Sequence, residues 1–229
     1  MTEGARVVQK RVAACFHGFL RTGASMWWMA RTLRRAGYLD VALPTFGYHL
    51  TPLDVHAPRA VAAIAALRQK WPDATIDLVT HSFGGILARA ALGLPAVAAG
   101  GAPRVRRVVM LSPPNQGALL AEQVRKVLPF HRMGWDPLHQ ITPGVPAARP
   151  LPGDIGQTEF GVLTGGTGEK GWSPWLGEDN DGKVRVDEAW LEGASDFLVV
   201  PVRHSMMPFS PLSHQQAIAF LETGRFARP

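Results

Sequence analysis

A serine near the middle of the chain has the surroundings of a chemically active group. Residues 76–89 have the sequence IDLVTHSFGGILAR, which predicts a buried strand, a sharp turn that carries Ser82 and then a helix. Gly84 and Gly85 suit such a turn, because residues without a Cβ let the helix start close to the strand. A serine hydroxyl becomes a nucleophile when a base lies within hydrogen-bond reach and N–H groups can hold the developing oxyanion. Ser82 is therefore a candidate nucleophile, and the alternative is a serine that only caps the helix.

A candidate base and a candidate acid follow later in the chain. His204 stands shortly after a hydrophobic run, FLVV, and an imidazole can exchange a proton near neutral pH. Asp181 lies in the segment DNDGKV, where Asp-Gly is first of all a turn signal. Its position between Ser82 and His204 makes Asp181 a candidate for the acid that orients the base. Asp179, two residues earlier, is the alternative acid.

The oxyanion needs backbone donors, and a loop near the N-terminus offers one. The segment FHGFL at 16–20 comes directly after a predicted strand. Loops at the carboxyl ends of parallel strands form a common crevice, so this loop should face the turn at Ser82. We expect the N–H groups of Phe19 and Phe83 to form the oxyanion hole, where the loss of one donor typically costs about 3 kcal/mol of transition-state stabilisation. The alternative is a His-Gly turn without a chemical role.

Strand-like and helix-like patterns alternate along the chain and position these groups. Six short apolar runs predict strands, at 12–16, 40–43, 76–80, 105–111, 160–163 and 196–200. Helical patterns stand between and after them, at 26–36, 58–71, 83–92, 117–128 and 212–221. Such alternation is typical of an α/β protein, with a minimal open sheet of about six parallel strands and helices on both faces. Ser82 and His204 would then lie at the same edge of the sheet.

Length and composition favour one domain. A chain of 229 residues can bury a substantial core, and we expect a single domain over 1–229. Residues 129–156 are rich in proline and glycine and predict a surface excursion that covers the active site. Cys15 is the only cysteine, so no disulfide can form within the chain, and its place in a predicted strand favours a buried, inert thiol.

Several classes of function are disfavoured. The formal net charge is +6, but the basic residues are spread out without interleaved aromatic residues, so no nucleic-acid partner is expected. The absence of an HExxH motif, a cysteine cluster and a helical histidine pair argues against zinc, and no metal or other cofactor is expected. No apolar run reaches the roughly 20 residues of a membrane span, and residues 1–10 are polar, so we expect a cytoplasmic protein.

Taken together, the motifs resemble the α/β-hydrolase superfamily, specifically its small bacterial lipase-like and esterase-like members. The resemblance covers nearly the whole chain and rests on HGF at 17–19, THSFG at 80–84, SPPNQG at 112–117, DGKV at 181–184 and His204. It implies an α/β-hydrolase fold whose nucleophile, acid and base are Ser82, Asp181 and His204. The same resemblance places the oxyanion hole at the N–H groups of Phe19 and Phe83.

Two features depart from the family pattern. The position two residues before the nucleophile usually holds a small residue, and here it holds Thr80, whose branched Cβ must fit inside the tight turn. The first two strands of the family have no counterpart before residue 12, which indicates a minimal hydrolase core.

The resemblance implies hydrolysis of carboxylic esters through an acyl-enzyme on Ser82. Apolar side chains near the oxyanion loop and in the excursion are candidate substrate contacts: Leu20, Trp27, Trp28 and Trp135. They suggest a hydrophobic small-molecule ester as the partner. The alternatives are an acyltransferase or thioesterase with the same triad, and a protein of this fold that binds a hydrophobic ligand without turnover.

Overall fold

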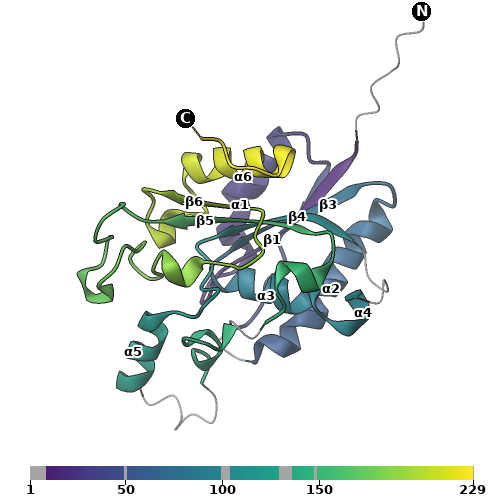
Figure 1. Ribbon diagram of the computed structural model, residues 1–229. Helices are drawn as coiled ribbons and strands as arrows, with labels where there is room; N and C mark the ends of the chain where they lie inside the picture. The colour runs from purple at the N-terminus through teal and green to yellow at the C-terminus, as the bar shows by residue number, and fades with distance from the viewer. Residues whose placement is uncertain (1–8, 49–50, 99–103, 129–135, 147–148, 229) are drawn as a thin grey trace, which may run out of the picture.

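The computed structural model describes residues 9–48, 51–98, 104–128, 136–146 and 149–228. Its centre is one open sheet of six strands, in which every neighbouring pair is parallel and the order is β2-β1-β3-β4-β5-β6 (Figure 1). The strands are β1 (Arg11–Phe16), β2 (Asp40–Ala42), β3 (Thr75–His81), β4 (Val105–Leu111), β5 (Glu159–Gly165) and β6 (Asp196–Val200). This architecture confirms the predicted parallel α/β sheet, with strand ends within two residues of those expected.

The strand register brings the candidate catalytic segments to one edge of the sheet. The last residue of β1 pairs with Thr80, and the last residues of β3 and β4 pair with each other. At the far side Gly165 pairs with Val200, so β5 and β6 end side by side. The loops that leave β1, β3, β5 and β6 therefore start from the same edge, as parallel strands require.

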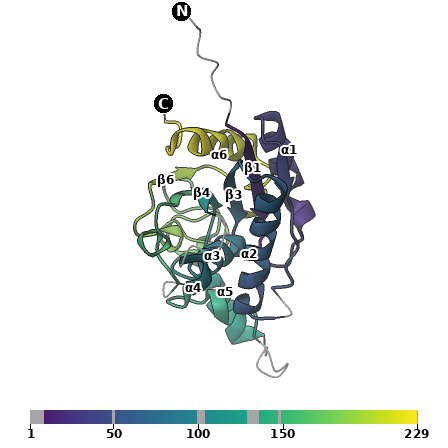
Figure 2. The same ribbon diagram turned by 90° about the vertical axis from the view of Figure 1, so that its right-hand side faces the viewer.

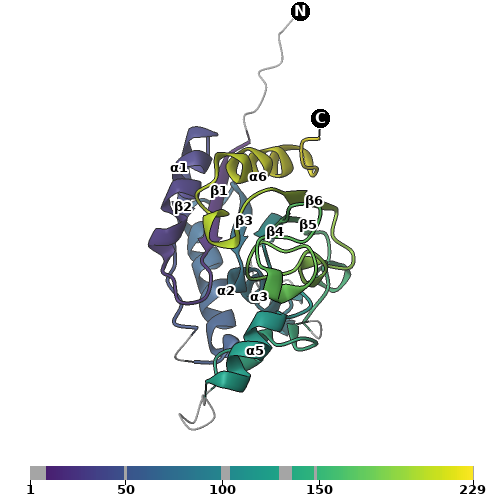
Figure 3. The ribbon, with the colours of Figure 1, turned by 90° about the vertical axis from the view of Figure 1, so that its left-hand side faces the viewer.

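Helices cover both faces of the sheet. On one face lie α1 (Trp27–Arg35) and α6 (Pro211–Thr223), and on the other lie α2 (Leu53–Lys70) and α3 (Phe83–Leu92) (Figures 1 and 2). Because successive side chains of a strand point to opposite faces, each face of the sheet contributes side chains to a separate hydrophobic core. Two further helices are α4 (Pro95–Ala98), between α3 and β4 in the chain, and α5 (Leu119–Val127), after β4. Helix α5 lies apart from the two helical layers, at the bottom of Figure 3.

Strand β1 shows this alternation most clearly. Val12, Ala14 and Phe16 belong to the core formed with α2 and α3. Ala13 and Cys15 belong to the core formed with α1 and α6. Burial raises the pKa of the Cys15 thiol to about 12, so the thiol stays protonated and behaves as a small apolar side chain.

Helix α2 begins five residues before the expected start at residue 58. Leu53 is its first residue, and the Leu53 N–H donates to the side-chain amide oxygen of Gln140. Pro58 therefore lies inside the helix and removes one intrahelical hydrogen bond. A cap supplied from 87 positions away is invisible in the local sequence pattern, and for this reason the helix start was predicted wrongly.

The predicted excursion over 129–156 is described at 136–146 and 149–156. These stretches contain two short 3-10 helices, η3 (His139–Ile141) and η5 (Pro152–Ile155), and otherwise consist of turns and irregular backbone. Among the described helices, none has both the length and the apolar character needed to cross a bilayer.

Candidate active site

Ser82 stands on a strained turn between β3 and α3. Its backbone has φ 52° and ψ −122°, a conformation that side-chain-bearing residues rarely adopt. The Ser82 N–H donates to the carbonyl of Leu111, 2.8 Å away, which ties the turn to the neighbouring strand β4. Strain of this kind costs about 1–3 kcal/mol and persists only where the surrounding structure enforces it. The turn leaves Ser82 half-buried at the carboxyl edge of the sheet.

The glycines after Ser82 allow the close approach of α3 to the sheet. A Cβ on Gly84 would lie 2.5 Å from the carbonyl oxygen of Phe16, at the end of β1. A Cβ on Gly85 would lie 2.7 Å from the methyl group of Met110 and 3.4 Å from the hydroxyl of Thr80. Gly85 therefore lets α3 pack against the side chain of Met110, and the Thr80 hydroxyl beside it donates to the carbonyl of Val109.

His204 connects Ser82 with Asp181. Its Nε2 lies 3.0 Å from the Ser82 hydroxyl oxygen, and its Nδ1 lies 2.7 Å from Oδ2 of Asp181. The Asp181 side chain is fully buried, so its carboxylate needs a donor, and Nδ1–H is the donor that this geometry offers. That tautomer leaves the Nε2 lone pair free to accept the proton of the Ser82 hydroxyl.

The loop between β5 and β6 holds Asp181 rigidly against His204. Oδ1 of Asp181 accepts hydrogen bonds from the N–H groups of Lys183 and Val184, at 2.9 and 2.8 Å. The His204 N–H donates to the Asp181 carbonyl at 2.9 Å, so the two residues are joined through their backbones as well as through their side chains. Gly165 permits this approach, because a Cβ there would collide with Val202 and with Asp181.

Asp179, the alternative acid, faces away from His204. Its Oδ1 accepts from the N–H of Thr167 at 2.8 Å, and its Oδ2 accepts from the N–H of Gly168 at 2.9 Å. Residues two apart in this irregular loop therefore serve different purposes. Asp181 contacts His204, and Asp179 binds the backbone of the turn that follows β5.

His17 fixes the peptide group that carries the Phe19 N–H. The Phe46 N–H donates to Nε2 of His17 at 2.9 Å, so the ring proton must be on Nδ1. Nδ1–H donates to the Gly18 carbonyl at 2.8 Å, and burial lowers the pKa of His17, which keeps the ring neutral. The Gly18 carbonyl and the Phe19 N–H belong to one planar peptide and point in opposite directions. Anchoring the carbonyl therefore sets the direction of the N–H.

The second expected oxyanion donor is the first N–H of α3. Phe83 opens this helix, and the first N–H groups of a helix have no partner within the helix. The positive end of the helix dipole also lies there and favours a developing negative charge. Phe19 and Phe83 lie close together, with ring centroids 5.9 Å apart.

His81 supports His204 from behind. It is fully buried, its Nε2–H donates to the His204 carbonyl at 3.0 Å, and the two rings are 5.0 Å apart. Burial is the main cause of a His81 pKa far below its ordinary value, and the neighbouring charge of His204 acts in the same direction. His81 therefore stays neutral and does not oppose a positive charge on His204.

A cavity of about 480 Å³ opens in front of Ser82 and His204. One wall is apolar and comes from α5, the residue before it and η3 with its preceding residue: Ala118, Leu120, Ala121, Val124, Leu138 and Ile141. The lining also includes two cations, Arg21 and Lys183. The cavity therefore combines an apolar wall with two basic side chains.

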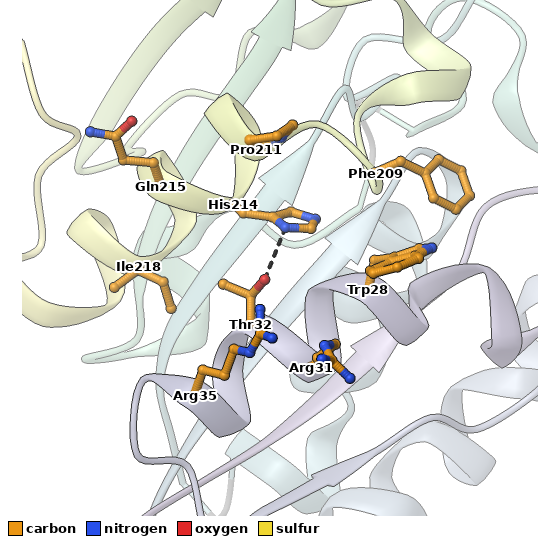
Figure 4. Close-up of a pocket in the computed structure, with 9 residues that line it drawn as sticks. All are labelled: Trp28, Arg31, Thr32, Arg35, Phe209, Pro211, His214, Gln215 and Ile218. Carbon is orange, nitrogen blue, oxygen red and sulfur yellow. Dashed lines mark hydrogen bonds between the residues drawn. The ribbon is translucent and has the colours of Figure 1, made fainter.

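The expected substrate contacts are divided by the structure. Phe19 and Leu20 line the cavity. Trp27 and Trp28 do not line it, because they stand on the outer face of α1, where both are exposed. Trp28 borders a separate surface groove between α1 and α6, beside the hydrogen bond that joins Thr32 to His214 (Figure 4). Trp135 lies outside the described residues.

Sequence reasoning missed several groups at this site. His17 and His81 entered the sequence analysis only as parts of the HGF and THSFG motifs, and their partners Phe46 and His204 are distant in the sequence. The apolar wall of α5 could have been found from the amphipathic pattern of that helix. No cluster of three metal-ligating side chains occurs in the described ranges.

Comparisons with known proteins agree with this architecture. The family described as Alpha/beta hydrolase family matches residues 14–222. The mature lipase BlEst2 of Bacillus licheniformis is similar over 97% of this chain and 95% of its own, with 18% identity and a TM-score of 0.71. A metagenomic carboxyl esterase is similar over 86% of this chain and 65% of its own, with 21% identity and a TM-score of 0.63.

Lipase B of Aspergillus fumigatus is also similar, over 93% of this chain and 52% of its own, with 16% identity and a TM-score of 0.66. At such identities the likeness concerns the fold alone. No curated protein sequence gives a significant match to the chain.

Proposed function

The chain belongs to the alpha/beta hydrolase family, and from this premise we propose that it is a serine hydrolase that cleaves carboxylic esters through an acyl-enzyme on Ser82. One observation carries the proposal. His204 lies 3.0 Å from the Ser82 hydroxyl oxygen and 2.7 Å from the buried Asp181 carboxylate, at the mouth of a cavity with an apolar wall.

In the acylation step, the Ser82 oxygen attacks the ester carbonyl while Nε2 of His204 takes the hydroxyl proton. Asp181 holds the imidazole in the tautomer that can accept this proton, and it stabilises the imidazolium that results. The N–H groups of Phe19 and Phe83 hold the oxyanion. The bond between the acyl carbon and the alcohol oxygen then breaks, and His204 gives its proton to the departing alcohol.

In the deacylation step, His204 takes a proton from water, and the hydroxide oxygen bonds to the acyl carbon. The bond to Ser82 breaks, the serine recovers its proton from His204, and the carboxylic acid leaves. The neutral His81 favours both steps, because a positive charge behind His204 would oppose formation of the imidazolium.

An apolar acyl group suits the wall formed by α5 and η3. The names of the structural neighbours also support ester hydrolysis, since they include lipases and a carboxyl esterase. No cofactor has a part in this scheme.

The test is hydrolysis of 4-nitrophenyl butanoate together with labelling by a fluorophosphonate, which reacts with activated serines. We expect the wild type to hydrolyse the ester and to be labelled, and Ser82→Ala to lose about 10³-fold or more of kcat and all labelling. Ser25→Ala, which removes a hydroxyl bonded only to the Thr22 carbonyl, serves as the matched control. Full activity of Ser82→Ala, or a wild type that neither reacts nor is labelled, would contradict the proposal.

A further inference from the structure

Two cations at the Ser82 cavity have no part in the proposed steps. Arg21 and Lys183 both line the cavity, although they come from different segments, the oxyanion loop and the loop that carries Asp181. No aspartate or glutamate is among the described residues that line it. Arg21 is half-buried and Lys183 is exposed, so an anionic group that enters the cavity can reach both positive charges.

Neither cation is neutralised within the described part of the chain. The ion pairs found there join other residues, and none includes Arg21 or Lys183. A guanidinium N–H of Arg21 reaches only the Ser205 carbonyl, at 3.5 Å, and the guanidinium stacks over the Phe209 ring at 5.7 Å. The nearby carboxylate of Asp181 is already bonded to His204 and to two backbone N–H groups.

Both cations stand on the side of the cavity where His204 lies. Arg21 contacts the backbone of Ser205, the residue that follows the base. Lys183 is two residues from Asp181, and its N–H bonds to the Asp181 carboxylate. Both positive charges also reach the imidazole of His81 and help to lower its pKa, which agrees with their closeness to the catalytic groups.

This placement distinguishes the two parts of an ester. The departing alcohol oxygen must lie near Nε2 of His204 to receive its proton, so the alcohol part extends toward the two cations. The acyl part then has the apolar wall of α5 and η3. On the basis of the proposed function, we propose that Arg21 and Lys183 select esters of an apolar acid with an anionic alcohol, one that carries a carboxylate or a phosphate.

The chemistry of the step is unchanged by this selection. The Ser82 oxygen bonds to the acyl carbon, the bond to the alcohol oxygen breaks, and the proton taken by His204 goes to the alcohol. Water then releases the acid. The anionic group keeps its charge throughout, so its contact with the two cations improves binding and orientation of the alcohol part.

The test uses esters that differ only in charge: 3-(octanoyloxy)benzoate, its neutral benzamide analogue and 3-(octanoyloxy)phenyl phosphate. For the wild type at low salt we expect kcat/KM to be at least about tenfold higher for the benzoate than for the benzamide, with the ratio falling as salt is added. The ratio of the phosphate ester to the benzoate tells which anionic group is preferred.

Single substitutions test whether Arg21 and Lys183 cause the preference for the benzoate. We expect Arg21→Gln and Lys183→Gln each to lower the benzoate-to-benzamide ratio by about threefold to tenfold, and Arg21→Lys and Lys183→Arg to retain most of it. Arg31→Gln and Lys170→Gln remove the same charge from exposed positions outside the cavity and should leave the ratio unchanged. A glutamine variant in the cavity that slows both esters by the same factor would contradict the proposal.

Failure of this inference differs from failure of the proposed function. A wild type that hydrolyses the benzoate and the benzamide equally well overturns the selection of anionic alcohols and leaves ester hydrolysis intact. If the wild type hydrolyses none of the esters, the role of the two cations is tested by measuring how tightly the benzoate and the benzamide bind to Ser82→Ala. Tighter binding of the benzoate than of the benzamide supports the role of the two cations, and equal binding overturns it.

Discussion

At the scale of single residues, the proposal of Asp181 as the acid depends on which way two nearby carboxylates point. In the sequence both Asp179 and Asp181 lie near the same turn, and only the DGKV pattern of the resemblance favours Asp181. In the structure Asp181 bonds to His204 at 2.7 Å, while Asp179 bonds to the N–H groups of Thr167 and Gly168. The contacts that distinguish the two carboxylates are tertiary, and the local sequence does not show them.

These two residues allow a matched pair of substitutions. We expect Asp181→Asn to lower kcat by about 10³–10⁴-fold, because an amide at this position would favour the wrong tautomer of His204. Asp179→Asn makes the same chemical change in a carboxylate that faces away, and it should keep kcat within about twofold. Steady-state hydrolysis of a 4-nitrophenyl ester measures both. Equal losses in the two variants would contradict the assignment of Asp181.

The same reasoning explains which site residues could be predicted. Ser82 and His204 follow strands at the carboxyl edge, so their types and positions were enough to propose them. Trp27 and Trp28 were proposed as contacts because they follow the oxyanion loop, but the helix that contains them turns their side chains to the outer surface. Closeness in sequence did not predict direction.

At the scale of elements, the central strands β3 and β4 were predictable because each is a short, mostly apolar run that is largely buried, a signal that is local. The start of α2 was not predictable, because the group that binds its first N–H comes from the distant residue Gln140. The nucleophile turn depends on both kinds of information. Its glycines are visible in the sequence, whereas the carbonyl of Phe16 that makes Gly84 necessary belongs to another strand.

We expect Gly84→Ala to disturb the junction between β1 and α3. Its Cβ would lie 2.5 Å from the Phe16 carbonyl oxygen, and backbone on both sides leaves no flexible atom to move. The helix must shift, which should lower the free energy of unfolding by about 1–3 kcal/mol in spite of a gain of about 1 kcal/mol in helix propensity. The shift should also lower kcat, because it separates the N–H groups of Phe19 and Phe83.

Gly153→Ala is the control for this substitution, because its Cβ would meet no atom within 4 Å. Urea unfolding and ester hydrolysis of both variants give the comparison. A Gly84→Ala protein with the stability and kcat of the wild type would show that the close packing of α3 on β1 is not required.

At the scale of the whole molecule, one sheet serves two cores, and the site lies where its strands end. Because β1 and β3 contribute side chains to both cores, neither core is complete without the central strands. We therefore propose that the chain folds as one domain. The two cores also bury polar groups, and several histidines are among them.

The buried histidines make the stability of the protein sensitive to pH. Loss of contact with water lowers the pKa values of three buried histidines, His17, His56 and His81, and of the half-buried His214. In the unfolded chain a histidine has a pKa of about 6.5. As the pH falls below this value, the unfolded chain binds protons that the folded protein does not, so stability is complete above about pH 6.5 and is lost as the pH decreases.

Carboxylates do not cancel this trend. Hydrogen bonds lower the pKa values of Asp40 and Asp196, so their contribution is lost only in stronger acid. Glu188 has the opposite sign, because burial raises its pKa and the folded protein therefore retains a proton above the range of the unfolded chain. Because Glu188 is a single group and four histidines act in the other direction, the histidines should determine how the free energy of unfolding changes between pH 7.5 and 5.5.

We therefore expect the free energy of unfolding in urea to fall as the pH is lowered from 7.5 to 5.5, by up to about 1.4 kcal/mol per pH unit for each histidine that stays neutral. His214→Gln should make the slope shallower, since it removes the half-buried ring that bonds to Thr32 and Pro208. His139→Gln, at an exposed position, should leave the slope unchanged. A free energy of unfolding that is constant or rises toward pH 5.5 would show that these histidines bind protons in the folded protein. In that case His81 could carry a positive charge behind His204, and catalysis would weaken in acid before the fold did.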